Sequence, residues 1–198
     1  MPDQTSTYGL LARVREGDEE AFTQLFRKTS PRLAVLIHSK MSTEMRGRIE
    51  VDDLLQETFV AAYRSLGRFD YRNPGSFMSW LARIADHVIV DAARHHGRRK
   101  RRPVELVPLG SNDGYGAHEA ADSVTPSRIL VRKEKIQRVQ DALNRLPEDY
   151  RRVILLSRIQ GLPMQEVAEC MGRSRESTAV LLHRAVRRLK QVDDMSGA

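Results

Sequence analysis

Residues 162–190 constrain the fold more than any other stretch, because a helix stop signal separates two amphipathic patterns there. The first pattern has apolar residues at the spacing of a helix with one buried face: Met164, Val167, Ala168 and Met171. Gly172 then offers the left-handed backbone conformation that ends a helix, and Ser174 can cap the next helix with its side-chain oxygen. The second pattern continues through Thr178, Leu181, Leu182, Ala185 and Leu189. Two short helices joined by a tight glycine turn are a helix-turn-helix.

Basic residues gather on or beside the second of these helices: Arg173, Arg175, His183, Arg184, Arg187, Arg188 and Lys190. A helix that lies against a phosphate backbone needs such residues. A plain helical bundle that contains the same Gly-Arg-Ser turn is the structural alternative. The cluster of basic residues favours DNA binding over that alternative.

Helical periodicity extends over most of the remaining chain. The predicted helices cover residues 7–15 and 19–29, a segment opened by Pro31, a segment opened by Asp52 and Asp53, and residues 76–99, 127–143 and 148–159. In the segment that starts at Asp52, Asp53 and Gln56 have the spacing of a capping box. We therefore expect an all-α fold.

Charge divides the chain into blocks. Residues 71–102 carry a net charge of +6 and residues 128–198 carry another +6, whereas residues 103–127 hold four acidic residues and no Lys or Arg. The central stretch also lacks helical periodicity and contains turn-forming residues at 110–116. We expect two small helical domains, residues 1–102 and 128–198, joined by a flexible acidic linker at 103–127. Two basic blocks indicate two contacts with a polyanion, which the linker would avoid.

Composition argues against several classes of protein. No apolar run approaches the roughly 20 residues that span a bilayer, so membrane insertion is not expected. The first residues lack the basic start and apolar core of a signal peptide, and we expect a cytoplasmic protein. The single cysteine, Cys170, excludes an internal disulfide framework and is more typical of a small core residue than of a nucleophile.

Two separated stretches resemble the bacterial sigma factors of the extracytoplasmic-function type, which belong to the sigma-70 family. The first comprises residues 51–63 (VDDLLQETFVAAY), Phe69-Asp70, residues 77–87 and Asp91, and it is similar to the family's region 2. The second comprises residues 146–154, Gly161, Glu166-Val167-Ala168 and residues 182–185, and it is similar to region 4. Their order and the linker between them match the family over most of the chain.

The resemblance implies a protein that binds core RNA polymerase and directs it to promoters. It implies that one face of the helix at Asp53 docks on the clamp helices of the largest polymerase subunit, through Asp53, Gln56, Glu57, Val60 and Tyr63. Val60 and Tyr63 among polar side chains independently suggest a partner surface. An anti-sigma factor is a further partner that such proteins often have. We expect no cofactor, no metal and no enzymatic activity.

The resemblance also implies two contacts with promoter DNA. The helix at Trp80 and the loop before it would recognise and open the minus-10 element. Melting needs groups that hold flipped bases and cations that hold the backbone, and our candidates are Asn73, Arg83, His87, Asp91, Arg94, Arg98 and Arg99. The helix-turn-helix would contact the minus-35 duplex through Arg173, Ser174, Arg175, Glu176, Ser177, His183, Arg184 and Arg187.

The sequence departs from the family pattern at two places. His87 stands where the family commonly has Asn, which changes the chemistry of the minus-10 contact. Ala179, Val180 and Leu181 stand where small polar and basic residues are usual. Fewer hydrogen-bonding side chains would then reach base edges in the minus-35 element, although Val180 could contact a thymine methyl group.

Two other functions account for parts of the sequence. A stand-alone helix-turn-helix regulator explains the C-terminal half but gives no role to the helix at Asp53 or to the long basic helix. An enzyme would require a metal-binding cluster of Asp52, Asp53, Glu57, His87 and Asp91. Their spacing is instead that of helix caps and solvent-facing positions, so the sigma-factor interpretation is preferred.

Overall fold

The computed structural model describes residues 5–99 and 126–194, with side chains at 5–95 and 134–192. Every regular element within these residues is helical, as predicted. The N-terminal part contains α1 (Thr7–Arg15), α2 (Glu19–Lys40), α3 (Thr43–Arg46), α4 (Val51–Ser65), the 3-10 turn η1 (Leu66–Arg68) and α5 (Ser76–Arg99). The C-terminal part contains α6 (Pro126–Asn144), α7 (Glu148–Ile154), the π-helical turn η2 (Leu155–Ile159), α8 (Met164–Met171) and α9 (Arg175–Asp194). Residues 103–125 of the predicted linker lie outside the described residues.

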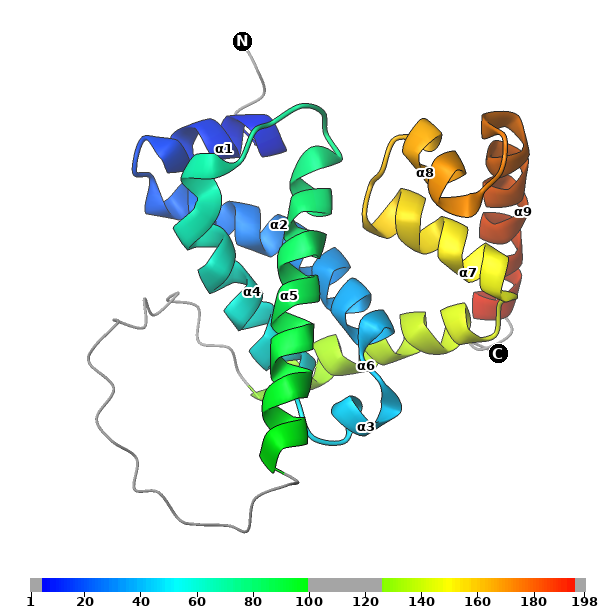
Figure 1. Ribbon diagram of the computed structural model, residues 1–198, viewed down its shortest axis with the longest axis horizontal. Coiled ribbons are helices and arrows are strands. Elements are labelled where there is room, and N and C mark those ends of the chain that lie inside the picture. The colour runs from blue at the N-terminus through cyan, green and yellow to red at the C-terminus, as the bar shows by residue number, and fades with distance from the viewer. Residues whose placement is uncertain (1–4, 100–125, 195–198) are drawn as a thin grey trace.

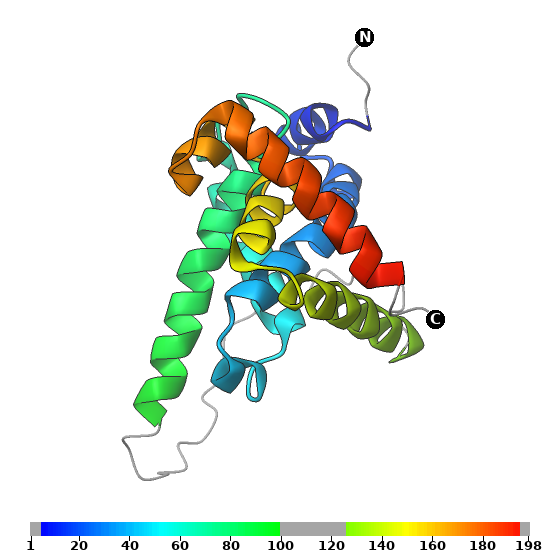
Figure 2. The same ribbon diagram turned by 90° about the vertical axis from the view of Figure 1, so that its right-hand side faces the viewer.

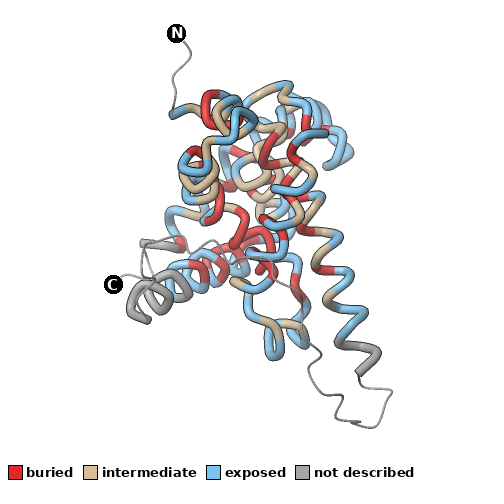
Figure 3. The backbone as a smooth tube through the Cα atoms, turned by 90° about the vertical axis from the view of Figure 1, so that its left-hand side faces the viewer, coloured by how far each residue is buried: buried red, intermediate tan, exposed pale blue. Residues whose placement is uncertain are grey.

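The helices form two groups (Figure 1), each built around a cluster of buried apolar side chains. Helices α1, α2, α4 and α5 enclose the first cluster, which includes Leu33, Leu36, Ile37, Leu54, Leu55, Phe59 and Leu81. Helices α6 to α9 enclose the second, which includes Leu143, Val153, Val167, Leu182 and Ala185. Within each helix these residues recur at helical spacing, so one side of the helix faces the core. Figure 3 shows the buried positions gathered where helices meet, while residues 90–95 of α5 are mostly exposed.

Helix α2 is continuous, and the prediction of a separate helix opened by Pro31 is wrong. Proline removes one helical hydrogen bond and usually marks a boundary. Here the side chains on both sides of it, Thr29 and Leu33, are buried, and the Thr29 hydroxyl donates a hydrogen bond to the Leu25 carbonyl at 2.8 Å. Packing on both sides of Pro31 therefore outweighs the lost bond.

Helix α4 begins at Val51, one residue earlier than predicted, with Glu50 as the N-cap residue and no side-chain cap hydrogen bond. Val51 packs against the first cluster, which extends the helix toward its N-terminus. Asp53 consequently lies inside the first turn, so the predicted capping box with Gln56 is wrong. Asp52 and Asp53 still favour the helix because carboxylates stabilise the positive end of its dipole.

The predicted helix at 148–159 changes its geometry after Ile154. The turn Leu155–Ile159 is π-helical, and the Gln160 amide donates to the Leu155 carbonyl at 2.8 Å, five residues back. A π turn widens the helix locally. The backbone carbonyl of Ile159 then lies at a helix end, where it needs a partner from outside the helix.

The two parts of the molecule are packed against each other. Val35 of α2 belongs to the second cluster, and Ile136 of α6 belongs to the first. Helix α2 contacts both α6 and η2. Figure 2 shows α5 on one side of this assembly, with its C-terminal end projecting beyond the other helices. No described helix is long and apolar enough to cross a membrane.

Candidate functional surfaces

The five residues predicted to bind polymerase lie together on the exposed side of α4, and we call this surface the docking face. It consists of Asp53, Gln56, Glu57, Val60 and Tyr63, all of which are exposed. Positions spaced by three or four residues share one side of a helix. Val60 is 44% exposed and Tyr63 is 58% exposed, which is unusual for large apolar side chains in the midst of charge.

The opposite side of α4 is fixed by the core. Leu54, Leu55, Thr58, Phe59 and Ala62 are buried there, and the Thr58 hydroxyl donates to the Leu54 carbonyl at 2.6 Å. The edge of the Tyr63 ring contacts the ring of Phe22 in α2, with 4.9 Å between centroids. The docking face is therefore a preformed surface on a rigid helix.

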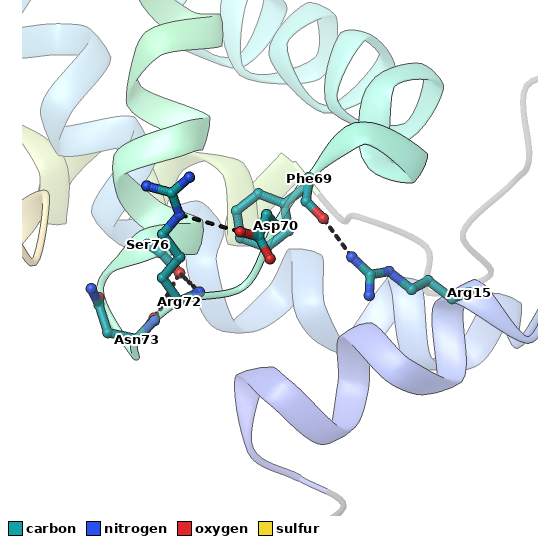
Figure 4. A network of polar contacts seen from close by, with 6 residues as sticks. All are labelled: Arg15, Phe69, Asp70, Arg72, Asn73 and Ser76. Carbon is teal, nitrogen blue, oxygen red and sulfur yellow. Dashed lines mark hydrogen bonds and ion pairs between the residues drawn. The ribbon is translucent and has the colours of Figure 1, made fainter.

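A hydrogen-bonded loop, residues 70–75, leads from η1 into α5, and we call it the promoter-loop candidate (Figure 4). Arg15 of α1 donates to the Phe69 carbonyl at its start. At its end, the Asn73 side-chain oxygen accepts from the Gly75 amide at 2.9 Å, and the Ser76 hydroxyl donates to the Asn73 carbonyl at 2.7 Å. Asn73 is one of the predicted minus-10 residues. Its side-chain oxygen is used within the loop, and its side-chain amide nitrogen remains as a hydrogen-bond donor.

Helix α5 displays four of the predicted minus-10 residues along one exposed side, namely Arg83, His87, Asp91 and Arg94. Asp91 and Arg94 form an ion pair at 3.7 Å, so Asp91 orients a cation. Ser76 and Arg94 are separated by about 27 Å along the helix, at 1.5 Å per residue. Arg98 and Arg99 belong to the last turn of α5, and their side chains lie outside the described residues.

The helix-turn-helix forms at the predicted position. Gly172 adopts the left-handed conformation with φ of 63°, as α8 ends. The Ser174 hydroxyl caps α9 by accepting from the Ser177 amide at 3.2 Å, and Arg173 pairs with Asp149 of α7 at 2.6 Å. Arg173 and Ser174 thus have structural contacts as well as their predicted place at the DNA surface.

The remaining predicted minus-35 residues are exposed on the first turns and middle of α9: Arg175, Glu176, Ser177, His183, Arg184 and Arg187. Ala179 and Val180 share that exposed surface, and Val180 is 51% exposed. Leu181 is partly buried and packs against the second cluster. Two of the three unusual apolar residues are therefore exposed on α9, while the third packs against the core.

Cys170 is exposed on α8, so its prediction as a core residue is wrong. Val167 and Ala168 fill the buried side of this short helix, and a residue two positions beyond Ala168 turns away from the core. No group of three His, Cys, Asp or Glu side chains that could hold a metal ion occurs within the described parts of the chain. Asp52, Asp53, Glu57, His87 and Asp91 accordingly do not form the cluster that the enzyme alternative requires.

Sequence reasoning missed the residues that join the two parts. Arg32 of α2 donates to the Ile159 carbonyl at 2.9 Å, and Gln140 of α6 donates to the Val35 carbonyl at 2.7 Å. Gly75 and Gly161 meet backbone to backbone. The sequence marks the glycines as turn residues, but it carries no signal for which distant segment they contact.

Two family models match the chain. The model described as Sigma-70 region 2 matches residues 25–99, and the model described as Sigma-70, region 4 matches residues 136–189. The first therefore covers α4, the promoter-loop candidate and α5. The second covers most of α6 through α9, including the helix-turn-helix.

The relatives are similar along most of their length. The extracytoplasmic-function (ECF) RNA polymerase sigma-E factor of Haemophilus influenzae is 32% identical over 171 residues, covering 86% of each chain. The RNA polymerase sigma factor CarQ of Myxococcus xanthus is 30% identical over 183 residues, covering 92% of this chain and 94% of CarQ. A solved structure of CnrH in complex with the cytosolic domain of CnrY is 26% identical and covers 96% of this chain, with a TM-score of 0.47.

Both family regions occur in the order and at the helices predicted from the sequence, and the identity to the sigma-E factor extends through both. Proteins of this family are DNA-binding transcription regulators. The chain belongs to the sigma-70 family as an extracytoplasmic-function sigma factor, and it directs transcription initiation.

Proposed function

We propose that the docking face of α4 binds the clamp helices of the largest subunit of core RNA polymerase. Its support is the exposure of all five side chains on one rigid helix. Val60 and Tyr63 would provide the apolar centre of the interface, while Asp53 and Glu57 would pair with basic groups on the polymerase. Because the surface is preformed, little ordering of the sigma factor opposes binding.

The promoter-loop candidate and α5 hold the minus-10 element as a single strand in this proposal. Arg83 and Arg94 are exposed cations that can contact phosphates, and His87 between them offers a ring for stacking and a polar edge. Unstacked bases are stabilised when such groups replace their neighbours in the duplex. Asn73 would add its free amide nitrogen at the N-terminal end of this surface.

Helix α9 contacts the minus-35 element as a duplex. An α-helix fits the major groove, where Arg175, Arg184 and Arg187 can contact phosphates or guanine edges. Ala179 and Val180 occupy the middle of the exposed side and can contact only methyl groups there. The proposed minus-35 contact is therefore rich in phosphate binding and poor in base hydrogen bonds, which places more sequence selectivity at minus-10.

These surfaces assign a separate role to each part of the chain. Residues 1–102 form the domain that binds polymerase and the minus-10 element, residues 128–198 form the minus-35 domain, and residues 103–127 connect them. Core RNA polymerase, promoter DNA and an anti-sigma factor are the partners of this scheme. Polymerase and DNA imply that the protein acts in the cytoplasm.

The observation that carries the proposal is the docking face, because duplex binding alone requires no exposed Val60 and Tyr63. Transcription in vitro with core polymerase on a promoter library tests it. We expect the factor to produce transcripts from templates that share two upstream elements, with the stronger consensus at minus-10. A protein that binds duplex DNA but yields no transcripts beyond those of core polymerase alone would contradict the proposal.

A further inference from the structure

The surfaces assigned above leave one exposed aromatic side chain without a role. Two aromatic side chains are exposed within the described residues, namely Tyr63 of the docking face and Tyr8 in the first turn of α1, which is 51% exposed. A single exposed apolar residue is common on protein surfaces. The neighbours of Tyr8 therefore decide what this ring can bind.

Helix α1 lies along the promoter-loop candidate and contacts it from both of its own ends. Near its start, the Tyr8 ring lies against the ring of Tyr71 in the loop, with 5.2 Å between centroids and 58° between planes. At its end, Arg15 donates a hydrogen bond to the Phe69 carbonyl, just before the loop, as Figure 4 shows. Tyr8 is therefore a direct neighbour of the segment proposed to hold the minus-10 strand.

Both rings of this pair are held in place by the fold. The Ser6 hydroxyl caps α1 by accepting from the Gly9 amide at 3.0 Å, and Leu10 and Leu11 anchor the helix in the first cluster. Tyr71 is half-buried and packs against the same cluster. A planar ring that is already fixed loses little conformational entropy when a flat ligand stacks on its exposed part.

An exposed cation follows Tyr71 directly in the chain. Arg72 Nε lies 3.2 Å from the Asp70 carboxylate, and both side chains are exposed. An ion pair in this much water is worth little, so a phosphate can take the place of the carboxylate. An aromatic ring for bases beside a cation for the backbone is the combination by which proteins hold single-stranded nucleic acid.

The order of the residues in space continues the proposed DNA surface toward Tyr8. The exposed residues of α5 run from Arg94 through His87 to Arg83, toward the start of the helix. Asn73 lies in the loop before that start. In Figure 1 this loop passes from the start of α5 across to α1. A strand that follows α5 and crosses Asn73 consequently reaches Tyr8 next.

We propose that Tyr8 stacks on one unpaired base of the promoter strand, beyond the bases held by Asn73 and α5, while Arg72 contacts a phosphate beside it. The inference rests on the proposed function for the single-stranded minus-10 element. Tyr8 precedes residues 25–99, which the region 2 model matches, so α1 would add a contact to that region. Because every base has a π face, this contact stabilises the melted strand without selecting its sequence.

The lifetime of open promoter complexes tests the stacking. The full-length chain is combined with core RNA polymerase and a promoter selected by transcription in vitro, and the complexes that survive a DNA competitor are followed over time. Tyr8→Leu keeps an apolar contact with Tyr71 but removes the flat ring, and it should shorten the lifetime about tenfold. Tyr8→Phe is the matched control, because it keeps the ring, and its lifetime should stay within about twofold of wild type.

Promoters that lack one base identify the stacked nucleotide. Abasic positions are introduced one at a time along each strand, through the minus-10 element and the nucleotides beside it. At one position the missing base should shorten the lifetime of the wild-type complex, and Tyr8→Leu should then cause no further loss. Such non-additivity shows that the ring and the base act on each other. Additive losses at every position would overturn the inference.

Two further measurements separate stacking from other roles of Tyr8. Circular dichroism should show the same helix content in Tyr8→Leu as in the wild-type chain, and both should co-elute equally with core polymerase. A loss of co-elution would place Tyr8 in the polymerase interface and overturn the inference. An active wild-type chain with an equally long-lived Tyr8→Leu complex would refute the inference alone, whereas a wild-type chain without transcripts would refute the proposed function as well.

Discussion

The docking face of α4 and the promoter-loop candidate before α5 differ in how accessible they are, although both belong to the same domain. The docking face is exposed within the described part of the chain, and its side chains extend from a helix whose other side is buried in the core. The promoter-loop candidate is held by hydrogen bonds from α1 and α5, and its Gly75 contacts the backbone of Gly161 in the C-terminal domain. The two surfaces therefore differ in access: the side chains of the docking face are exposed, whereas Gly75 of the loop is in contact with Gly161.

Reversing a charge on the docking face should have the largest effect. We predict that Glu57→Lys weakens binding to core polymerase by about a hundredfold, on the order of 3 kcal/mol, because like charges would face each other across the interface. Glu57 is exposed, so the free energy of unfolding should change by less than about 0.5 kcal/mol. Co-elution with core polymerase and urea unfolding measure the two quantities.

Glu16→Lys is the control for this charge reversal, because Glu16 is exposed in the same domain but outside the docking face. It should leave polymerase affinity within about twofold of wild type. Equal losses in both variants would show that net charge, and not the docking face, determines binding.

Removing the buried amide between α2 and α6 should have the next largest effect. We predict that Gln140→Leu destabilises the folded chain by about 2 kcal/mol, because the Val35 carbonyl loses its partner in a buried position. Urea unfolding detects the change. Gln137→Leu on the exposed side of α6 is the matched control. Affinity for core polymerase should stay constant in both variants. If Gln140→Leu also weakened polymerase binding, the docking face would depend on the contact between α2 and α6.

The sequence predicted these surfaces unequally well. Helical spacing placed Glu57, Val60 and Tyr63 together correctly, since three to four residues per turn determine which side chains share a side. The helix-turn-helix was predicted correctly from Gly172 and Ser174, because ending one helix and capping the next depend only on neighbouring residues. Local rules were also sufficient for the boundaries of α1 and α5.

Errors arose where distant packing overrides local preference. The continuity of α2 through Pro31 depends on residues buried on both sides, and the exposure of Cys170 depends on which side of α8 faces the core. The domain contact could not be predicted because Arg32 and Ile159 are 127 residues apart. Nothing in the sequence near either residue identifies the other.

A salt titration examines the DNA surface of α5 separately from polymerase docking. We predict that Arg94→Gln lowers the slope of log affinity against log salt by about one for promoter complexes, because one phosphate contact is lost. Removing Arg98 and Arg99 as well should lower it by about one each. Arg68→Gln, an exposed cation in η1 outside this side of α5, should leave the slope unchanged. If Arg94→Gln leaves the slope unchanged, Arg94 does not contact a phosphate in the promoter complex.

Acidification should have the smallest effect. His38 of α2 is 9% exposed, and burial lowers its pKa from the ordinary 6.5, with Arg46 adding to the shift and Gln140 and Asp141 opposing it. The folded chain therefore binds a proton at His38 more weakly than the unfolded chain does. This contribution to stability should be fully present above pH 6.5 and be lost as the pH falls below that value.

His38→Gln isolates this contribution because it removes the titrating group from α2. The free energy of unfolding of this variant should depend less on pH than that of the wild-type chain. A wild-type free energy of unfolding that rises as the pH falls below 6.5 would contradict the sign of the predicted effect.

Affinity for core RNA polymerase, compared between the wild-type chain and Glu57→Lys at one salt concentration, decides whether the docking face is the polymerase-binding surface. We predict that the wild-type chain co-elutes with core polymerase and that Glu57→Lys binds it about a hundredfold more weakly. Equal affinity of the two chains for core polymerase would contradict the proposed role of the docking face.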